Sequence, residues 1–143
     1  MNHHTTSFTF DVPAPYATVA PLFGAHEERR WATGWDPEFI FPQPARDVEG
    51  MVFRVGDTIW INSIFDLGRG RVQYVNVAGG EIVTRIDIRL HDRAGNTAVD
   101  VTYERTALTD SAIAAANELA EADRKKAPEW ESSIRAAVGA GKR

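Results

Sequence analysis

The side chains with the most chemical potential in this sequence are aromatic. Seven of them, including every tryptophan, can share one inner face of the protein: Trp31, Trp35, Trp60, Trp130, Phe53, Tyr74 and Tyr103. Rings of this kind line pockets for apolar molecules, and their N–H and O–H groups orient a ligand. The alternative is that the rings only fill the core. We expect at least some of them to line a pocket.

Groups suited to acid–base, nucleophilic or metal chemistry are scarce. Asp87, Asp100 and Glu104 fall opposite arginines on an outer strand face, where a solvated ion pair contributes about 0–1 kcal/mol. His26 has no second histidine four residues away, so metal-ligand spacing is absent. The sequence has no cysteine, and its serines lack the glycines of a nucleophile elbow. We therefore predict no metal, no cofactor and no catalytic constellation.

Paired strands must position the aromatic side chains, and the clearest strand signal lies between residues 81 and 107. One antiparallel register about the Ala94-Gly95 turn matches apolar residues with apolar residues and opposite charges with each other. Its pairs are Ile86 with Tyr103, Ile88 with Val101, Leu90 with Val99, Arg85 with Glu104, and Arg89 with Asp100. The inner face of this hairpin is apolar, so another part of the chain must cover it.

A second hairpin is predicted about Gly56-Asp57, because a glycine in the first position suits a type II′ turn. Its register pairs Phe53 with Trp60 and Met51 with Asn62. If Trp60 faces inward, Asn62 does so too, and a buried amide needs a protein or ligand partner.

A third hairpin turns at Gly79-Gly80, and the sequence leaves its register open. A two-residue loop places Val75 and Val77 on the inner face. A three-residue loop places Tyr74 and Asn76 there instead. The choice decides whether a tyrosine or two valines join the predicted pocket.

The N-terminal third combines a strand with short helices. Alternation predicts a strand over residues 7–12, followed by a helix that begins at Pro15 and is interrupted by Pro21. A second short helix is predicted over residues 26–31. Residues 39–41 can form only an edge strand, because prolines surround them.

The C-terminal region reads as one long helical segment over residues 110–138, with Thr109 as its N-cap. Pro128 is expected to kink this helix or to divide it in two. The segments around Pro128 and over residues 35–49 are the predicted lids of the pocket, because proline denies them backbone hydrogen bonds.

This order of elements predicts an α+β fold in one domain over residues 1–143. We expect a curved antiparallel sheet of six to seven strands wrapped around the long C-terminal helix, with two short helices after the first strand. A single helix, about 10 Å across, is too narrow to fill the concave face of such a sheet. We therefore predict a cavity whose wall includes Trp31, Trp35, Phe53, Trp60, Asn62, Tyr74, Ile86, Ile88, Val101, Tyr103 and Trp130.

Five short motifs point to a known family: Glu28-Arg29-Arg30-Trp31, Gly34-Trp35-Asp36-Pro37, Thr58-Ile59-Trp60, Val101-Thr102-Tyr103 and Glu129-Trp130-Glu131. With the order of elements, they resemble the START-like (SRPBCC) superfamily, in particular its bacterial single-domain members. The resemblance covers nearly the whole chain and implies the helix-grip fold, a seven-stranded sheet around a C-terminal helix with a cavity between them. Members include plant pollen-allergen proteins, lipid-transfer START domains and polyketide cyclases. The resemblance is therefore more specific for fold than for function.

Three functions are compatible with these features. The first is a carrier or sensor that binds a small apolar or aromatic molecule, such as a lipid or polyketide, in the cavity. The second is an enzyme of the polyketide cyclase or dehydratase type, for which Tyr103, Arg54, Arg105 and His26 are the candidate titratable groups. The third is an interaction module that resembles co-chaperone members of the superfamily.

Composition limits the partners. A net charge of −4 without a basic run argues against nucleic acid, and no apolar run approaches the roughly 20 residues that span a bilayer. The first residues do not resemble a secretory signal, so a cytoplasmic protein is the expectation. The expected partner is a small hydrophobic molecule, without stable membrane insertion. A homodimer is compatible with the sequence, which leaves the oligomeric state open.

Overall fold

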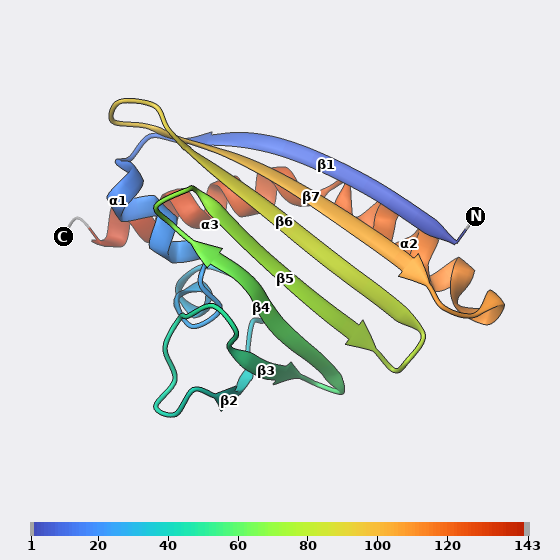
Figure 1. Ribbon diagram of the computed structural model, residues 1–143. Helices are drawn as coiled ribbons and strands as arrows, with labels where there is room; N and C mark the ends of the chain where they lie inside the picture. Colours follow the sequence, from blue (N-terminus) through green and yellow to red (C-terminus); the bar gives the residue numbers. More distant parts are fainter. Residues whose placement is uncertain (1, 142–143) are drawn as a thin grey trace.

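The computed structural model describes residues 2–141 and contains one antiparallel sheet of seven strands (Figure 1). The strand order is β1-β7-β6-β5-β4-β3-β2, so the first strand pairs with the last. The strands are β1 (His3–Val12), β2 (Glu38–Phe41), β3 (Val52–Val55), β4 (Thr58–Asp66), β5 (Arg71–Ala78), β6 (Ile82–Asp92) and β7 (Thr97–Ala107). The predicted α+β fold with a curved antiparallel sheet is confirmed.

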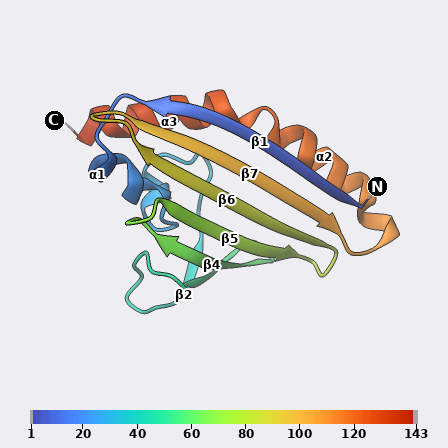
Figure 2. The same ribbon diagram turned by 45° about the horizontal axis from the view of Figure 1, so that its top comes forward.

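The helices occupy one side of the sheet. They are α1 (Tyr16–Val19), η1 (Ala20–Phe23), η2 (Glu27–Arg30), η3 (Asp110–Ala112), α2 (Ile113–Asp123) and α3 (Lys126–Gly141), where η denotes a 3-10 helix. Figure 2 shows α2 and α3 following one another along the sheet behind β1 and β7. The short helices α1, η1 and η2 lie near α3, at the end of the sheet away from α2 (Figure 1).

The predicted strand registers are confirmed. Ile86 pairs with Tyr103 and Ile88 with Val101 in the β6–β7 hairpin, and Phe53 pairs with Trp60 in the β3–β4 hairpin. The open question at Gly79-Gly80 is resolved because Ala78 pairs with Ile82, which makes a three-residue loop. Tyr74 and Asn76 are therefore on the inner face, where both are buried.

Pro128 divides the C-terminal segment rather than kinking it. The break falls at Arg124 and Lys125, between α2 and α3, because a proline ring excludes the carbonyl of the fourth residue before it. Pro128 itself occupies the first turn of α3, where the missing N–H is no disadvantage. Thr109 stands at the predicted N-cap, but its hydroxyl contacts the Ser111 hydroxyl at 3.1 Å and caps no backbone N–H.

The other proline predictions also have a structural outcome. At Pro21 the chain changes from α1 to the 3-10 helix η1, which is the predicted interruption. Residues 38–41 form β2, which is the edge strand next to β3. The strand predicted over residues 7–12 is longer in the structure, because β1 begins at His3 and pairs with β7 from there onward.

Gly70 fixes the turn between β4 and β5. It has a φ of +68°, and a Cβ at this position would lie 2.2 Å from the Leu90 carbonyl oxygen. The Leu90 amide donates a hydrogen bond to the Gly70 carbonyl at 2.8 Å. The Tyr16 hydroxyl donates to the Leu67 carbonyl in the same turn, so this turn connects α1 to the sheet. Only glycine suits this close approach.

Apolar packing stabilises the core, and a buried ion pair stabilises the α2 end of the sheet. Apolar side chains fill the space between the concave face and the helices, including the fully buried Val12, Phe23, Phe53, Ile88, Val99, Val101 and Ile134. At the α2 end, the buried carboxylate of Asp123 accepts hydrogen bonds from Arg105 Nε at 2.9 Å and Nη2 at 2.7 Å. This ion pair attaches α2 to β7.

The convex face is exposed and mixed in character. Arg85 and Glu104 form the predicted cross-strand ion pair, whereas Asp100 contacts His91 at 2.8 Å instead of Arg89. Ile59, Ile61 and Val77 are 40–44% exposed on neighbouring strands. None of the helices within residues 2–141 combines the length and apolar character needed to cross a membrane.

Candidate functional site

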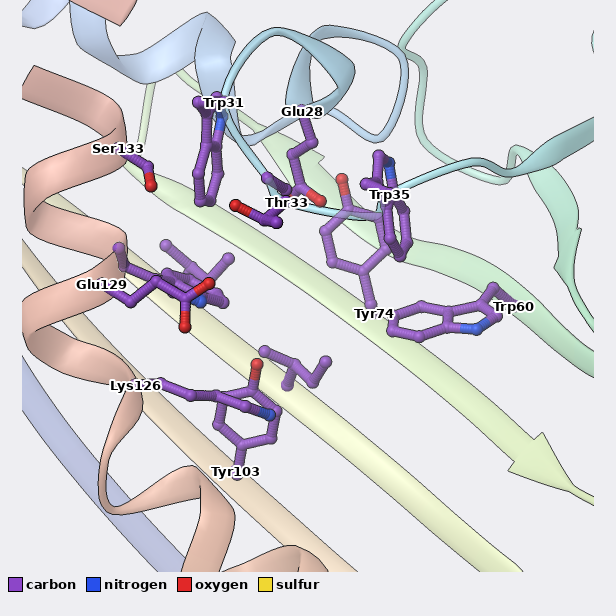
Figure 3. Close-up of a pocket in the computed structure, with 14 residues that line it drawn as sticks. Glu28, Trp31, Thr33, Trp35, Trp60, Tyr74, Tyr103, Lys126, Glu129 and Ser133 are labelled. Carbon is purple, nitrogen blue, oxygen red and sulfur yellow. The ribbon is translucent and has the colours of Figure 1, made fainter. Parts of the chain in front are cut away.

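A cavity of about 290 Å³ lies between the concave face of the sheet, the η2 region and α3 (Figure 3). Its wall is formed by Glu28, Trp31, Ala32, Thr33, Trp35, Trp60, Tyr74, Ile86, Ile88, Tyr103, Lys126, Glu129, Trp130 and Ser133. Three parts of the chain supply these residues: η2 and the segment after it, the inner faces of β4 to β7, and α3. The strand registers explain the sheet contribution, because they direct Trp60, Tyr74, Ile86, Ile88 and Tyr103 to the same face.

Aromatic contacts close the cavity at the junction of α3 with the short helices. The Trp130 ring lies 5.3 Å from the Trp31 ring, centroid to centroid, and 6.3 Å from the Tyr103 ring. At the other side of the cavity, Trp35 lies 5.3 Å from Trp60 in an edge-on arrangement. Edge-on aromatic pairs of this kind add about 0.5–1.5 kcal/mol beyond burial, so the rings are held in defined orientations.

Hydrogen bonds to backbone carbonyls fix three of these rings. Trp31 Nε1 donates to the Leu22 carbonyl at 2.6 Å, and Trp35 Nε1 donates to the Ala25 carbonyl at 2.8 Å. The Tyr74 hydroxyl donates to the Phe23 carbonyl at 2.6 Å. These donors are used within the protein, which leaves the faces and edges of the rings for an apolar ligand.

Glu28 is the chemically exceptional residue of the cavity. It is 8% exposed and reaches the cavity from η2, beside Thr33 and Tyr74 (Figure 3). Burial, followed by the charge of Asp47, raises the pKa of Glu28 well above its usual range. Both effects disfavour the ionised form of this side chain.

Asp47 holds the β2–β3 connection against η2 on the far side of Glu28. Its carboxylate accepts hydrogen bonds from the His26 amide at 2.7 Å and the Glu27 amide at 3.1 Å. Burial raises the pKa of Asp47, although these two hydrogen bonds oppose the increase. Gly24 makes room for this carboxylate, because a Cβ on Gly24 would lie 2.2 Å from it.

The opposite side of the cavity carries Tyr103 and Lys126. The Lys126 ammonium lies 4.3 Å from the centroid of the Tyr103 ring and donates to Asp123 at 2.7 Å. Burial of Lys126 lowers its pKa, and burial of Tyr103 raises the pKa of its hydroxyl. Burial also raises the pKa of Asp123, but the hydrogen bonds from Arg105 and Lys126 outweigh this and lower it overall. Lys126 is thereby held beside the cavity by the ion pair that attaches α2.

The structure brings eight of the eleven sequence-predicted residues together around the cavity: Trp31, Trp35, Trp60, Tyr74, Ile86, Ile88, Tyr103 and Trp130. Phe53 and Val101 do not line it and are fully buried in the surrounding core. Asn62 is also fully buried, at a bulge in β4. With its amide nitrogen facing them, Asn62 donates to the carbonyls of Ile64 at 2.7 Å and Gln73 at 3.0 Å. Its partners are therefore backbone groups of the bulge.

Sequence reasoning missed Glu28 and the polar residues of α3 that line the cavity. Glu28 lies in a charged run with Glu27, Arg29 and Arg30, and it is the one residue of η2 that is buried. The spacing of Lys126, Glu129 and Ser133 is helical, but the sequence did not give the start of α3, which decides that they face the cavity. Of the titratable candidates for an enzyme, only Tyr103 lines the cavity. Arg54 pairs with Glu38, Arg105 with Asp123, and His26 with Arg29.

Comparison with known structures shows which fold this geometry represents. Ara h 8.0201 superposes with a TM-score of 0.72 at 13% identity, over 96% of this chain and 99% of that one. The Zhui aromatase/cyclase from Streptomyces sp. R1128 gives 0.71 at 15% identity, over 99% and 96% of the two chains. The chain has the helix-grip fold.

A third helix-grip structure, CalU16 from Micromonospora echinospora, gives a TM-score of 0.65 at 16% identity, over 93% of this chain and 75% of that one. No family model matches the sequence, and no curated protein matches it. The likeness is therefore one of backbone architecture, and the site must be interpreted from its own residues.

Proposed function

We propose that this protein binds a compact aromatic or otherwise apolar molecule in the cavity between the sheet and α3. The observation that carries the proposal is the convergence of all four tryptophans and two tyrosines on one cavity. Rings held edge-on to one another and hydrogen-bonded to backbone carbonyls offer a preformed apolar site, which lowers the entropic cost of binding. Helix-grip architecture supports this use, because it leaves a hollow between the sheet and its helix.

The size of the cavity narrows the class of ligand. Liquid water occupies about 30 Å³ per molecule, so 290 Å³ corresponds to roughly ten to fifteen non-hydrogen atoms. This suits one or two fused rings better than a long acyl chain. A micromolar Kd, about −8 kcal/mol, then requires about 0.5–0.8 kcal/mol per atom, which lies within the range for small ligands.

Calorimetric titration with tetralin, a two-ring hydrocarbon, tests the proposal. Ser133→Phe places a ring on the cavity wall and should abolish binding, whereas Ser132→Phe, on the exposed neighbouring position of α3, should leave it unchanged. Both variants keep the tryptophans, so fluorescence provides an independent check of folding. Absence of binding to the wild-type protein, or equal binding by both variants, would refute the proposed site.

An enzyme that uses the same cavity is the second candidate, and Glu28 is the observation that favours it. A neutral buried acid can donate a proton to a leaving hydroxyl group, and the carboxylate that results can accept the α-proton, so that dehydration releases water and restores the acid. One similar structure is an aromatase/cyclase, which fits this chemistry. The test is conversion of a two-ring β-hydroxy ketone to its enone, followed by absorbance. Turnover by the wild type that Glu28→Gln abolishes supports the enzyme, and equal rates with and without protein refute it.

The third hypothesis, an interaction module, remains a prediction. The exposed Ile59, Ile61 and Val77 on the convex face are the surface it would use. A pull-down in which Ile61→Lys removes a specific partner supports this function, and an unchanged set of partners contradicts it.

A further inference from the structure

Glu28 presents an unused hydrogen-bonding group to the cavity. Its side chain lies on the cavity wall, and only burial and the distant charge of Asp47 act on its carboxyl. Within residues 2–141, no side chain or backbone group makes a hydrogen bond or ion pair with this carboxyl. The carboxyl faces the cavity, so a molecule bound there can become its hydrogen-bond partner.

Burial and the negative charge of Asp47 favour the neutral form of Glu28. Asp47 contributes negative charge from the β2–β3 connection, and Tyr74 on β5 is a neutral phenol whose own proton is already donated to Phe23. Across the cavity, Tyr103 on β7 is neutral, while Lys126 and Glu129 on α3 have opposite charges and Lys126 is bound to Asp123. No arginine or lysine forms an ion pair with Glu28 within the described residues. Glu28 therefore keeps an O–H that can be donated.

Tyr103 offers a second donor from the opposite wall. Its side chain is 4% exposed, and its ring is fixed between Phe8, Trp130 and the Lys126 ammonium. Its hydroxyl points into the cavity in Figure 3 and has no hydrogen-bond acceptor among residues 2–141. The apolar space between the two donors is bounded by Ile86 and Ile88.

We propose that Glu28 and Tyr103 are paired hydrogen-bond donors for acceptor oxygens of the bound molecule. The preferred ligand is then a neutral one- or two-ring compound with carbonyl oxygens, such as an aromatic ketone, rather than an organic acid or a plain hydrocarbon. This inference rests on the proposed function and specifies what the same cavity recognises. The donors face each other across the rings, so a ligand with two carbonyls at opposite ends uses both.

The test compares two ligands of the same shape, 1-tetralone and tetralin, which differ only in one carbonyl oxygen. Wild-type protein should bind the ketone about three- to tenfold more tightly, the usual gain from one hydrogen bond. Glu28→Leu combined with Tyr103→Phe should remove this preference, because no donor is left, while leaving the tetralin Kd within twofold. Glu28→Gln, which keeps a neutral donor, should retain the preference. Glu27→Leu is the matched control on the neighbouring position of η2 and should behave as the wild type.

A pH series separates donation by Glu28 from a merely structural role. Neither ligand titrates, so the ketone preference of the wild type should fall as pH rises through the ionisation of Glu28. The preference of Glu28→Gln should be independent of pH over the same range. Tyr103→Phe should reduce the binding of a two-ring diketone, 1,4-naphthoquinone, by about three- to tenfold without affecting tetralin.

The outcomes of the test distinguish the inference from the function on which it rests. If tetralin and 1-tetralone bind wild-type protein equally, or if Glu28→Leu weakens both equally, the inference is overturned while the cavity remains a binding site. If neither ligand binds and Ser133→Phe changes nothing, the proposed function itself fails. Retention of the ketone preference in the variant that combines Glu28→Leu with Tyr103→Phe would also overturn the inference.

Discussion

Removal of the Asp123 carboxylate should destabilise the protein far more than removal of an exposed carboxylate. Asp123 is completely buried and accepts hydrogen bonds from Arg105 Nε, Arg105 Nη2 and Lys126 Nζ, at 2.9, 2.7 and 2.7 Å. Asp123→Ala leaves the buried Arg105 guanidinium with Thr84 as its remaining hydrogen-bond partner. Breaking a buried pair from one side costs about 3–5 kcal/mol.

Urea unfolding followed by tryptophan fluorescence measures this cost. With an m-value of about 2 kcal/mol per molar urea, the midpoint of Asp123→Ala should fall by about 2 M. The matched control is Glu104→Ala, which removes the partner of the half-exposed Arg85 and should cost about 0–1 kcal/mol. Replacing both partners, as in Arg105→Met with Asp123→Leu, should recover much of the loss, because no unpaired charge stays buried.

The result that refutes this reasoning is an Asp123→Ala variant as stable as Glu104→Ala. It would mean that Arg105 reaches solvent when its partner is removed. The pH dependence gives a second check. Because the hydrogen bonds hold the pKa of Asp123 below its unfolded value, their stabilisation is present above that value and should be lost as pH falls through the folded pKa.

Three further predictions test other parts of the structure. Because burial raises the pKa of Glu28, the free energy of unfolding of the wild type should fall as pH rises above the unfolded pKa of about 4.3. Urea titrations of Glu28→Gln should lack this loss, and the same dependence of stability on pH in both proteins would contradict the prediction. Gly70→Ala should lower stability by at least about 1–3 kcal/mol, because its Cβ meets the Leu90 carbonyl, and a neutral effect in thermal unfolding would be inconsistent with that turn. Amides of residues 45–46 should exchange hydrogen faster than those of β6 and β7, because they lie outside any helix or strand; greater protection there would exclude this segment as a lid.

The parts of the fold that the sequence predicted are those fixed by local rules. Side-chain alternation and charge matching determined the pairing of Ile86 with Tyr103, since a slip of one residue would reverse every side chain. The register at Gly79-Gly80 stayed open because both loop lengths leave apolar residues on the inner face. Whether Pro128 kinks or divides the C-terminal helix also stayed open, and the structure divides it at Arg124 and Lys125, because the proline ring excludes the carbonyl four positions earlier.

The candidate site was less accessible to prediction than the fold. The aromatic residues were recognised as cavity residues because they are large and because the predicted strand registers place several of them on the inner face. Glu28 was not, because it lies in a charged run whose other members are exposed or half-buried, and no local pattern marks it as the residue that faces inward. Asn62 was directed to the correct face, but the bulge in β4 that supplies its partners has no signal in the sequence.

The division of the C-terminal segment has a consequence for how the cavity could accommodate ligands of different size. Helix α2 is tethered to β7 through Asp123, whereas α3 begins beyond the break and carries Lys126, Trp130 and Ser133 over the cavity. A tilt of α3 about Arg124 and Lys125 would enlarge the hollow without disturbing a single strand pair. The break thus makes the helix that covers the cavity a separate element from the helix that is bound to β7.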